Sequence, residues 1–234
     1  MQDLEASLTE HSVESLRWIV RFNNREHAAC LLVERLQASY KGTHPLVVAV
    51  PRGAVPMAKI IAEALGGDLD VVLVHKLGHP DQAELAIGAI DESGNSFLSE
   101  WAAEIDPEYI EAEKQRQLSI LRDRRARFTP RRAPVDPRDR IVIVVDDGIA
   151  TGSTITAALR AIRAKNPRKL IAAVAVASTQ AARAMLHECD TLMCLNVAAD
   201  FSAVGQFFGD FHQVSDQEVI EALRAAEARF SSAG

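Results

Sequence analysis

VIVVDDGIATGST, the stretch from Val142 to Thr154, decides the fold of this chain. It lies at the end of an apolar run, Ile141 to Val145, which is continuous rather than alternating, as in parallel strands covered on both faces. Two adjacent carboxylates, Asp146 and Asp147, follow the run, and small residues then lead into an expected helix. Open α/β sheets bind ligands at the carboxyl ends of their strands, so this loop is the first candidate site.

The rest of the chain repeats this alternation of strand and helix. Three further apolar runs predict buried strands at Leu46–Val50, Val71–Val74 and Leu170–Ala177. Helical spacing predicts helices at Arg25–Tyr40, Val55–Leu65, Thr154–Ala164 and Thr179–Glu188. Such an alternation predicts the α/β class, with a central parallel sheet flanked by helices.

Residues 76–140 interrupt the alternation. Leu85–Ile90 and Ser96–Leu98 flank the turn sequence DESGN, which predicts a hairpin. A polar helix is expected from Pro107 to Phe128, and three prolines after it mark a linker. Eight basic residues and one acid lie between Lys114 and Arg132. They suit a solvated face, a positive potential that attracts a polyanion, or an RNA-binding surface.

Composition narrows the class of protein. The 234 residues are 48% hydrophobic and 25% charged, as expected for a packed globular chain, and the net charge of −6 argues against a surface that binds nucleic acid throughout. Three cysteines without a C-x-x-C pair predict free thiols. The acidic start does not resemble a signal peptide, and no apolar run approaches the roughly 20 residues of a membrane span, so we expect a cytoplasmic protein without membrane contact.

The residue types in the loop after Val145 suit a phosphate next to a sugar. Gly148 and Gly152 let the backbone wrap closely around an anion, and the helix that follows directs its N–H groups at it. Hydroxyl donors come from Thr151, Ser153 and Thr154. Two carboxylates beside a phosphate need a cation or hydroxyl groups between them, and a ribose with Mg²⁺ supplies both. The structural alternative is that the two acids only cap the helix.

Other nucleotide sites lack their motifs. No G-x-x-x-x-G-K-S/T sequence occurs, so the apolar strand ending in aspartate is not part of a P-loop site. No G-x-G-x-x-G sequence occurs either, which removes the fingerprint of a dinucleotide site.

All 13 residues resemble the signature for 5-phosphoribosyl-1-pyrophosphate (PRPP) in type I phosphoribosyltransferases. The resemblance implies that fold, with a small hood built from N- and C-terminal segments. It also implies a catalytic acidic pair, Asp146 and Asp147, which faces the ribose hydroxyls. The residues implied for the 5-phosphate are Gly148, Ile149, Ala150, Thr151, Gly152, Ser153 and Thr154.

A second segment resembles the same family. VAVPRGAVP, from Val48 to Pro56, follows the first strand, where the family holds the pyrophosphate in a loop that often contains a non-proline cis peptide. The resemblance implies pyrophosphate contacts for Arg52 and Gly53, with Lys76 as a third, and we expect the cis bond between Pro51 and Ala54. From the residues alone, Arg52 could equally be a solvated loop side chain.

Three longer segments extend the resemblance to about 200 residues: FNNREHAACLLVERL, HKLGHPDQAELAIGAI and FSAVGQFFGDFHQVSDQEV. They resemble one subfamily of stand-alone phosphoribosyltransferases, from which this chain departs at Ala54 and His75, where Gly and Arg are common. The implied organisation is one domain, with a core at about residues 25–195 and a hood from about 10–24 and 196–215. A loop and hairpin at about residues 78–98 would close over the substrate.

The hood would hold the acceptor against Phe201, Phe207 or Arg25, although some of the clustered phenylalanines should pack only the hood's own core. His79 and His212 are further acid or base candidates. The expected function is transfer of the phosphoribosyl group from PRPP to a nitrogen acceptor. Mg²⁺ would be held mainly by substrate oxygens and water, with Asp146 and Asp147 as protein ligands. The alternative is a PRPP-sensing regulator without turnover. The acceptor stays open, and the expected assembly is a homodimer.

Overall fold

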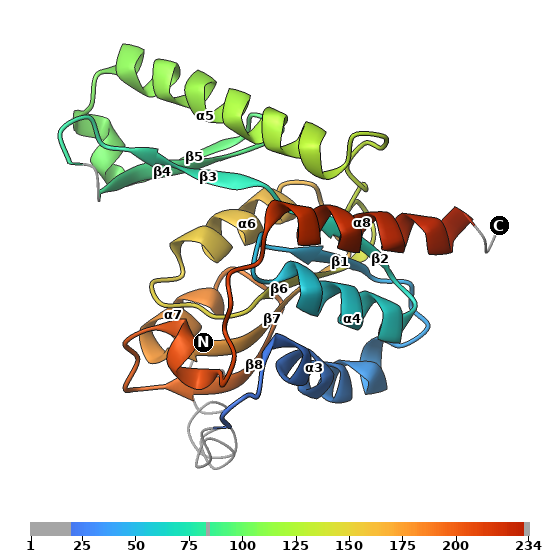
Figure 1. The fold of residues 1–234 in the computed structure, drawn as a ribbon. Helices are drawn as coiled ribbons and strands as arrows, with labels where there is room; N and C mark the ends of the chain where they lie inside the picture. Colours follow the sequence, from blue (N-terminus) through green and yellow to red (C-terminus); the bar gives the residue numbers. More distant parts are fainter. Residues whose placement is uncertain (1–19, 83–84, 232–234) are drawn as a thin grey trace.

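A five-stranded parallel sheet forms the centre of the molecule, in a computed structural model that describes residues 20–82 and 85–231 (Figure 1). The strand order is β2-β1-β6-β7-β8, and every neighbouring pair is parallel. The strands are β1 (Leu46–Ala49), β2 (Asp68–Val71), β6 (Ile141–Asp146), β7 (Lys169–Ser178) and β8 (Thr191–Ala198). The predicted α/β fold is confirmed, and β1 lies directly beside β6.

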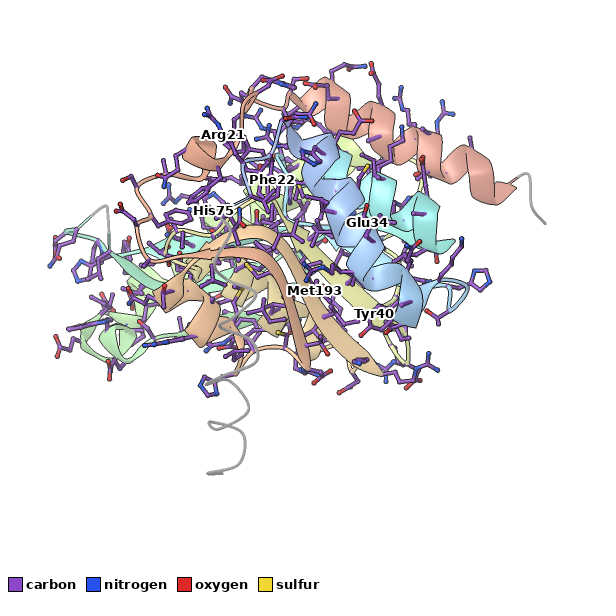
Figure 2. All side chains as sticks on the ribbon, turned by 90° about the horizontal axis from the view of Figure 1, so that it is seen from below. Arg21, Phe22, Glu34, Tyr40, His75 and Met193 are labelled. Atoms are coloured by element: carbon purple, nitrogen blue, oxygen red, sulfur yellow. The ribbon has the colours of Figure 1, made fainter. Side chains whose placement is uncertain are left out.

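Helices cover both faces of this sheet. Alternate residues of each strand point to opposite faces, so Val47, Ile143 and Ile171 pack in one apolar cluster while Val48 and Val144 pack in the other. The first cluster is covered by α3 (Arg25–Tyr40), α4 (Val55–Leu65) and α8 (Asp216–Ser231), and the second by α6 (Ser153–Arg163) and α7 (Thr179–Met185). In Figure 2, α3 runs from Phe22 near its start to Tyr40 at its end.

Local sequence explains where the two helices nearest the site begin and end. Asn24 caps α3 by accepting a hydrogen bond from the backbone N–H of His27. Pro56 fits the first turn of α4, and Gly66 ends that helix with a left-handed φ of 69°.

An arm projects from the sheet (Figure 1). It consists of a three-stranded antiparallel sheet, β3 (Val74–Gly78), β4 (Ala86–Asp91) and β5 (Ser96–Leu98), the short helix η2 (Glu100–Glu104), and α5 (Pro107–Phe128). The predicted hairpin is confirmed: Asp91 Oδ1 accepts hydrogen bonds from the backbone N–H groups of Ser93 and Asn95. Arg125 anchors the arm by donating to Asp70 at 2.7 Å and to the carbonyl of Val71 at 2.8 Å.

The C-terminal part of the hood lies over the carboxyl end of the sheet. It contains η3 (Val204–Phe207) and the loop that leads into α8. Phe22 bonds to this segment in both directions, with its N–H donating to Phe207 at 2.8 Å and its carbonyl accepting from Gly209 at 2.7 Å. Residues 10–19 of the predicted hood lie outside the described residues.

Two predictions about the sheet were wrong or incomplete. The strand expected at Val71–Val74 is β2 at Asp68–Val71, and β3 begins at Val74. The sequence did not indicate β2 because this strand contains carboxylates. Asp70 can be buried in it because Arg125, Arg132 and the N–H of Val135 donate hydrogen bonds to its carboxylate. The sequence also did not indicate β8 or α8. No helix among the described residues has the length and hydropathy to cross a membrane.

Candidate functional site

Two loops meet at the carboxyl edge of the sheet because β1 and β6 are neighbours. The backbone N–H of Val50 donates to the carbonyl of Val145 at 2.9 Å, which continues the pairing of the two strands to their ends. The loop after β1 holds Arg52 and Gly53, and the loop after β6 begins with the acidic pair. Arg52 and Gly53, two of the three predicted pyrophosphate residues, thus lie next to the predicted ribose residues.

Asp147 lies at the junction of the two loops. Its Oδ2 accepts a 2.8 Å hydrogen bond from Nε of Arg25, at the start of α3. A Cβ atom added to Gly53 would fall well inside contact distance of the same Oδ2 atom and 3.2 Å from Nη2 of Arg25. Only glycine at position 53 therefore lets the carboxylate and the pyrophosphate loop approach this closely.

Burial sets the ionisation of the acidic pair. Desolvation raises the pKa of Asp146 well above its ordinary value, and the negative charge of Asp147 raises it further. Desolvation also raises the pKa of Asp147, while the hydrogen bond and positive charge of Arg25 act in the opposite direction. The pair is therefore poised to gain stability from a positive charge placed next to it.

The loop after the acidic pair is fixed to the end of β7. Ile149 donates to the carbonyl of Val176 at 2.8 Å and accepts from the N–H of Ser178 at 3.0 Å, and Ser178 Oγ donates to the carbonyl of Ala150 at 2.7 Å. Gly148 packs against Val204, leaving no room there for a Cβ. These contacts hold the loop in one shape without using its outward-facing hydroxyl groups.

The loop then turns into α6 with the geometry of an anion site. Gly152 has a φ of 82°, in the left-handed region, and directly precedes the helix. The first N–H groups of α6 have no carbonyl partner within the helix, so they are available to an anion. The hydroxyl oxygens of Thr151 and Ser153 lie 3.2 Å apart at this end. Residues 149–154 thus have the arrangement expected for the 5-phosphate.

The expected cis peptide is confirmed at the Pro51–Arg52 bond. The Arg52 side chain extends toward the start of α8, where its Nη1 lies 3.2 Å from Oδ1 of Asp216. Lys76 is exposed on β3, in the arm, and is not part of this loop cluster.

The predicted cationic residues line two different cavities. The larger, about 420 Å³, is lined by Arg25, Arg52, Gly53, Asp147, Val204, Phe211, His212, Gln213 and Val214. The smaller, about 200 Å³, lies between the arm and α6, where Lys76 meets Ser153, Thr156 and Arg160. The larger cavity therefore joins Arg52 to the acidic pair and the hood, whereas Lys76 lies closer to the 5-phosphate side.

Neither of the two phenylalanines predicted for the acceptor, Phe201 and Phe207, lines the larger cavity. Phe207 is buried and packs against Phe201 with ring centroids 5.4 Å apart, so it belongs to the core of the hood and not to the cavity wall. Phe211 lines the cavity instead, and the guanidinium carbon of Arg25 lies 3.9 Å from its ring centroid. Arg25 also donates from Nη1 to the carbonyl of His212 at 2.7 Å, which fixes the hood against α3.

Sequence reasoning missed Val204, Phe211 and Asp216 as residues of the site. Phe211 belongs to the phenylalanine cluster of the sequence, but spacing alone could not show which ring faces inward. Asp216 lies inside the capping sequence Ser215-x-x-Glu218, where Glu218 accepts from the N–H of Ser215 at 2.8 Å. That motif could have placed Asp216 at the start of a helix next to the hood.

The carboxylates fit a magnesium ion that arrives with a substrate. No group of three or more His, Cys, Asp or Glu side chains in residues 20–82 and 85–231 is arranged to hold a metal. Asp146 and Asp147 supply adjacent hard oxygen ligands, which Mg²⁺ accepts when water and phosphate oxygens complete its shell. Both could therefore serve a Mg²⁺ ion held mainly by a polyphosphate, and the Mg²⁺ requirement stays a prediction.

Comparison with known proteins gives concordant matches. A family model described as phosphoribosyl transferase domain matches residues 23–209. Two curated Mycobacterium tuberculosis proteins, MT0597 and Rv0571c, provisionally named as phosphoribosyl transferases, are each 38% identical over 216 residues. That alignment covers 91% of this chain and 48% of theirs, so the chain spans about half the length of these relatives. The crystal structure of TT1426 from Thermus thermophilus is 39% identical, with a TM-score of 0.79 over 87% of this chain and 98% of that one.

Proposed function

Because the chain belongs to the family of phosphoribosyl transferase domains, we propose that it transfers the 5-phosphoribosyl group of PRPP to a nitrogen acceptor and releases pyrophosphate. One observation carries the proposal. Asp147 lies against Gly53, so the acidic pair is next to the loop that holds Arg52. The start of α6, which is suited to an anion, follows the acidic pair at the same edge of the sheet. A PRPP molecule has matching parts in the same order: 5-phosphate, ribose and pyrophosphate.

Different residues of the site bind the two phosphate-bearing ends of PRPP. The loop from Ile149 to Thr154 binds the 5-phosphate through helix N–H groups and hydroxyls. Arg52 binds the pyrophosphate, since a guanidinium pairs well with phosphate oxygens. Lys76 lines the smaller cavity with Ser153 and Thr156 of α6, so from the arm it would add positive charge near the 5-phosphate. These contacts fix the anomeric carbon beside the acidic pair.

The acidic pair acts when positive charge develops on the ribose. The bond between the anomeric carbon and the pyrophosphate oxygen breaks, the electron pair leaves with pyrophosphate, and the acceptor nitrogen forms the new bond and loses a proton. Asp146 and Asp147 stabilise the cationic ribose more than the neutral one, which is the condition for acceleration. Mg²⁺, when bound, would neutralise the negative charge of the pyrophosphate oxygens.

The larger cavity is the proposed acceptor site. Asp147, residues 212–214, Phe211 and Arg25 line it, and the Arg25 guanidinium lies over the Phe211 ring. A flat ring with polar edges matches such a wall. This chemistry favours a nucleobase or a related cyclic amine.

The test is release of pyrophosphate from PRPP with Mg²⁺, measured against a panel of nucleobases and amines. The Asp146→Asn, Asp147→Asn double variant is the inactive control. Release that depends on one acceptor, with a matching phosphoribosylated product by mass spectrometry, supports the proposal. Tight PRPP binding without release for any acceptor would support a PRPP-sensing regulator instead.

A further inference from the structure

The carboxylate of Asp216 lies between two arginines that come from distant parts of the chain. Nη1 of Arg52 lies 3.2 Å from its Oδ1 atom, and Nη1 of Arg127 lies 3.2 Å from its Oδ2 atom. Arg52 belongs to the loop after β1, Arg127 to the last turn of α5, and Asp216 to the first turn of α8. Figure 1 shows the end of α5 next to α8. The two guanidinium groups therefore converge on one anionic group.

The backbone that carries Arg127 is held in place. Two residues earlier, Arg125 is mostly buried and donates to Asp70, Glu92 and the carbonyl of Val71. Arg52 is likewise fixed at its base, in the loop that packs against Asp147. The two arginines are thus presented from anchored positions, and only their side chains are free to change partners.

The bonds to Asp216 are weaker than the buried ion pairs nearby. Both are 3.2 Å long, and the side chains of Arg52, Asp216 and Arg127 are 38%, 38% and 59% exposed. By contrast, Arg125 and Asp70 are 2.7 Å apart at 11% and 2% exposure. Water and salt screen exposed pairs strongly, so another anion can replace the carboxylate of Asp216 at low cost.

Asp216 is also not needed to cap α8. Ser215 Oγ accepts from the N–H of Glu218 at 3.2 Å, and Glu218 Oε2 accepts from the N–H of Ser215 at 2.8 Å. This reciprocal pair caps the helix with other side chains. The carboxylate of Asp216 is therefore available for a role that depends on its charge.

We propose that Arg52 and Arg127 form a clamp for the pyrophosphate group of PRPP, and that Asp216 is an internal competitor that the pyrophosphate displaces. The proposal rests on the proposed function, because it assigns a partner to Arg52 in the same substrate site. The larger cavity borders the clamp, since Arg52 and Val214 both line it. Pyrophosphate carries more charge than one carboxylate and offers several oxygens to two guanidinium forks. When it leaves, Asp216 returns, which speeds product release.

The experiment is calorimetric titration of inorganic pyrophosphate at fixed Mg²⁺ into wild type and three single variants. Asp216→Asn keeps the shape of the side chain but removes its charge, and it should bind pyrophosphate roughly threefold to tenfold more tightly. Arg127→Ala should bind about tenfold more weakly, as expected for the loss of a charged hydrogen bond. Arg122→Ala removes an exposed arginine of the same helix and should match wild type.

Each result of this titration either supports or overturns the proposed clamp. Equal pyrophosphate affinities for wild type and Asp216→Asn would overturn the role of Asp216 as a competitor. Equal losses of pyrophosphate affinity in Arg127→Ala and Arg122→Ala would overturn the clamp formed by Arg52 and Arg127. Absence of pyrophosphate binding in all four proteins would also overturn it. Turnover with PRPP is measured separately: if the affinities follow the expected order but no acceptor is modified, the proposed function fails and the clamp stands. If turnover is observed without that order, the clamp fails alone.

Discussion

Arg25 donates a 2.8 Å hydrogen bond from Nε to Oδ2 of Asp147, and this ion pair connects α3 to the acidic pair. The same guanidinium bonds to the carbonyl of His212 and covers the Phe211 ring. One side chain thus joins the proposed catalytic carboxylate to the hood. Its loss should affect both the charge of Asp147 and the shape of the proposed acceptor site.

Arg25→Gln should shift the pH dependence of turnover. Arg25 acts to lower the pKa of Asp147, so without it burial raises that pKa further. Because the proposed mechanism uses the pair as carboxylates, the rising acidic limb of the pH–rate profile should move to higher pH. The measurement is kcat against pH for both proteins. The control is Arg21→Gln, which changes an exposed arginine just before α3. An unchanged acidic limb would show that Arg25 does not govern ionisation of Asp147.

Gly53→Ala should separate the two loops. The new methyl group would collide with Oδ2 of Asp147, and the carboxyl carbon of the same side chain lies 3.0 Å away. A displacement of about 1 Å at reacting groups can cost about 10²-fold in rate, so turnover should fall by that order. Turnover of Gly53→Ala within a few-fold of wild type would remove the special role of Gly53.

Asp146→Asn should stabilise the protein at neutral pH. The folded-state pKa of Asp146 is raised by burial, so its favourable contribution is present below the unfolded pKa of about 3.9 and is lost as pH rises through the folded pKa. At neutral pH the wild type therefore carries the cost of a buried charge that the amide avoids. Urea denaturation should show a higher midpoint for the variant at pH 7, with the difference shrinking toward about pH 4, near the unfolded pKa. A lower midpoint at pH 7 would contradict the assigned burial cost.

The sequence predicted the parts of the fold where local pattern and tertiary environment agree. The apolar run before Asp146 and the bounds of α3, α4 and α5 are examples. It failed at β2, because Asp70 becomes acceptable in a buried strand only when Arg125 and Arg132 arrive from elsewhere. The loop residues of the site were recognisable because their glycines and acids are consecutive. Phe211 and Asp216 were not, since only the folded chain shows which hood ring faces Arg25 and which acid meets Arg52.

Some expectations stay predictions. They include the Mg²⁺ requirement, the homodimer, the cytoplasmic location and closure of residues 78–98. The RNA-binding interpretation of the basic helix also stays a prediction. Arg125 is buried against Asp70 and Glu92, whereas Arg116 and Arg127 pair with carboxylates but are 65% and 59% exposed.

The last prediction separates binding of the 5-phosphate from stabilisation of the cationic ribose. Thr151→Trp should abolish PRPP binding, because a bulky side chain at the start of α6 keeps the phosphate away from the helix N–H groups. The Asp146→Asn, Asp147→Asn double variant should keep PRPP affinity within roughly an order of magnitude, since amides of nearly the same shape still bond to ribose hydroxyls. Its turnover should nevertheless fall at least about 10²–10³-fold, because the lost charges matter most when the ribose is cationic. Calorimetry with Mg²⁺ and PRPP measures the affinity, and pyrophosphate release measures the turnover. Turnover of the double variant within a few-fold of wild type would show that the acidic pair does not stabilise the transition state.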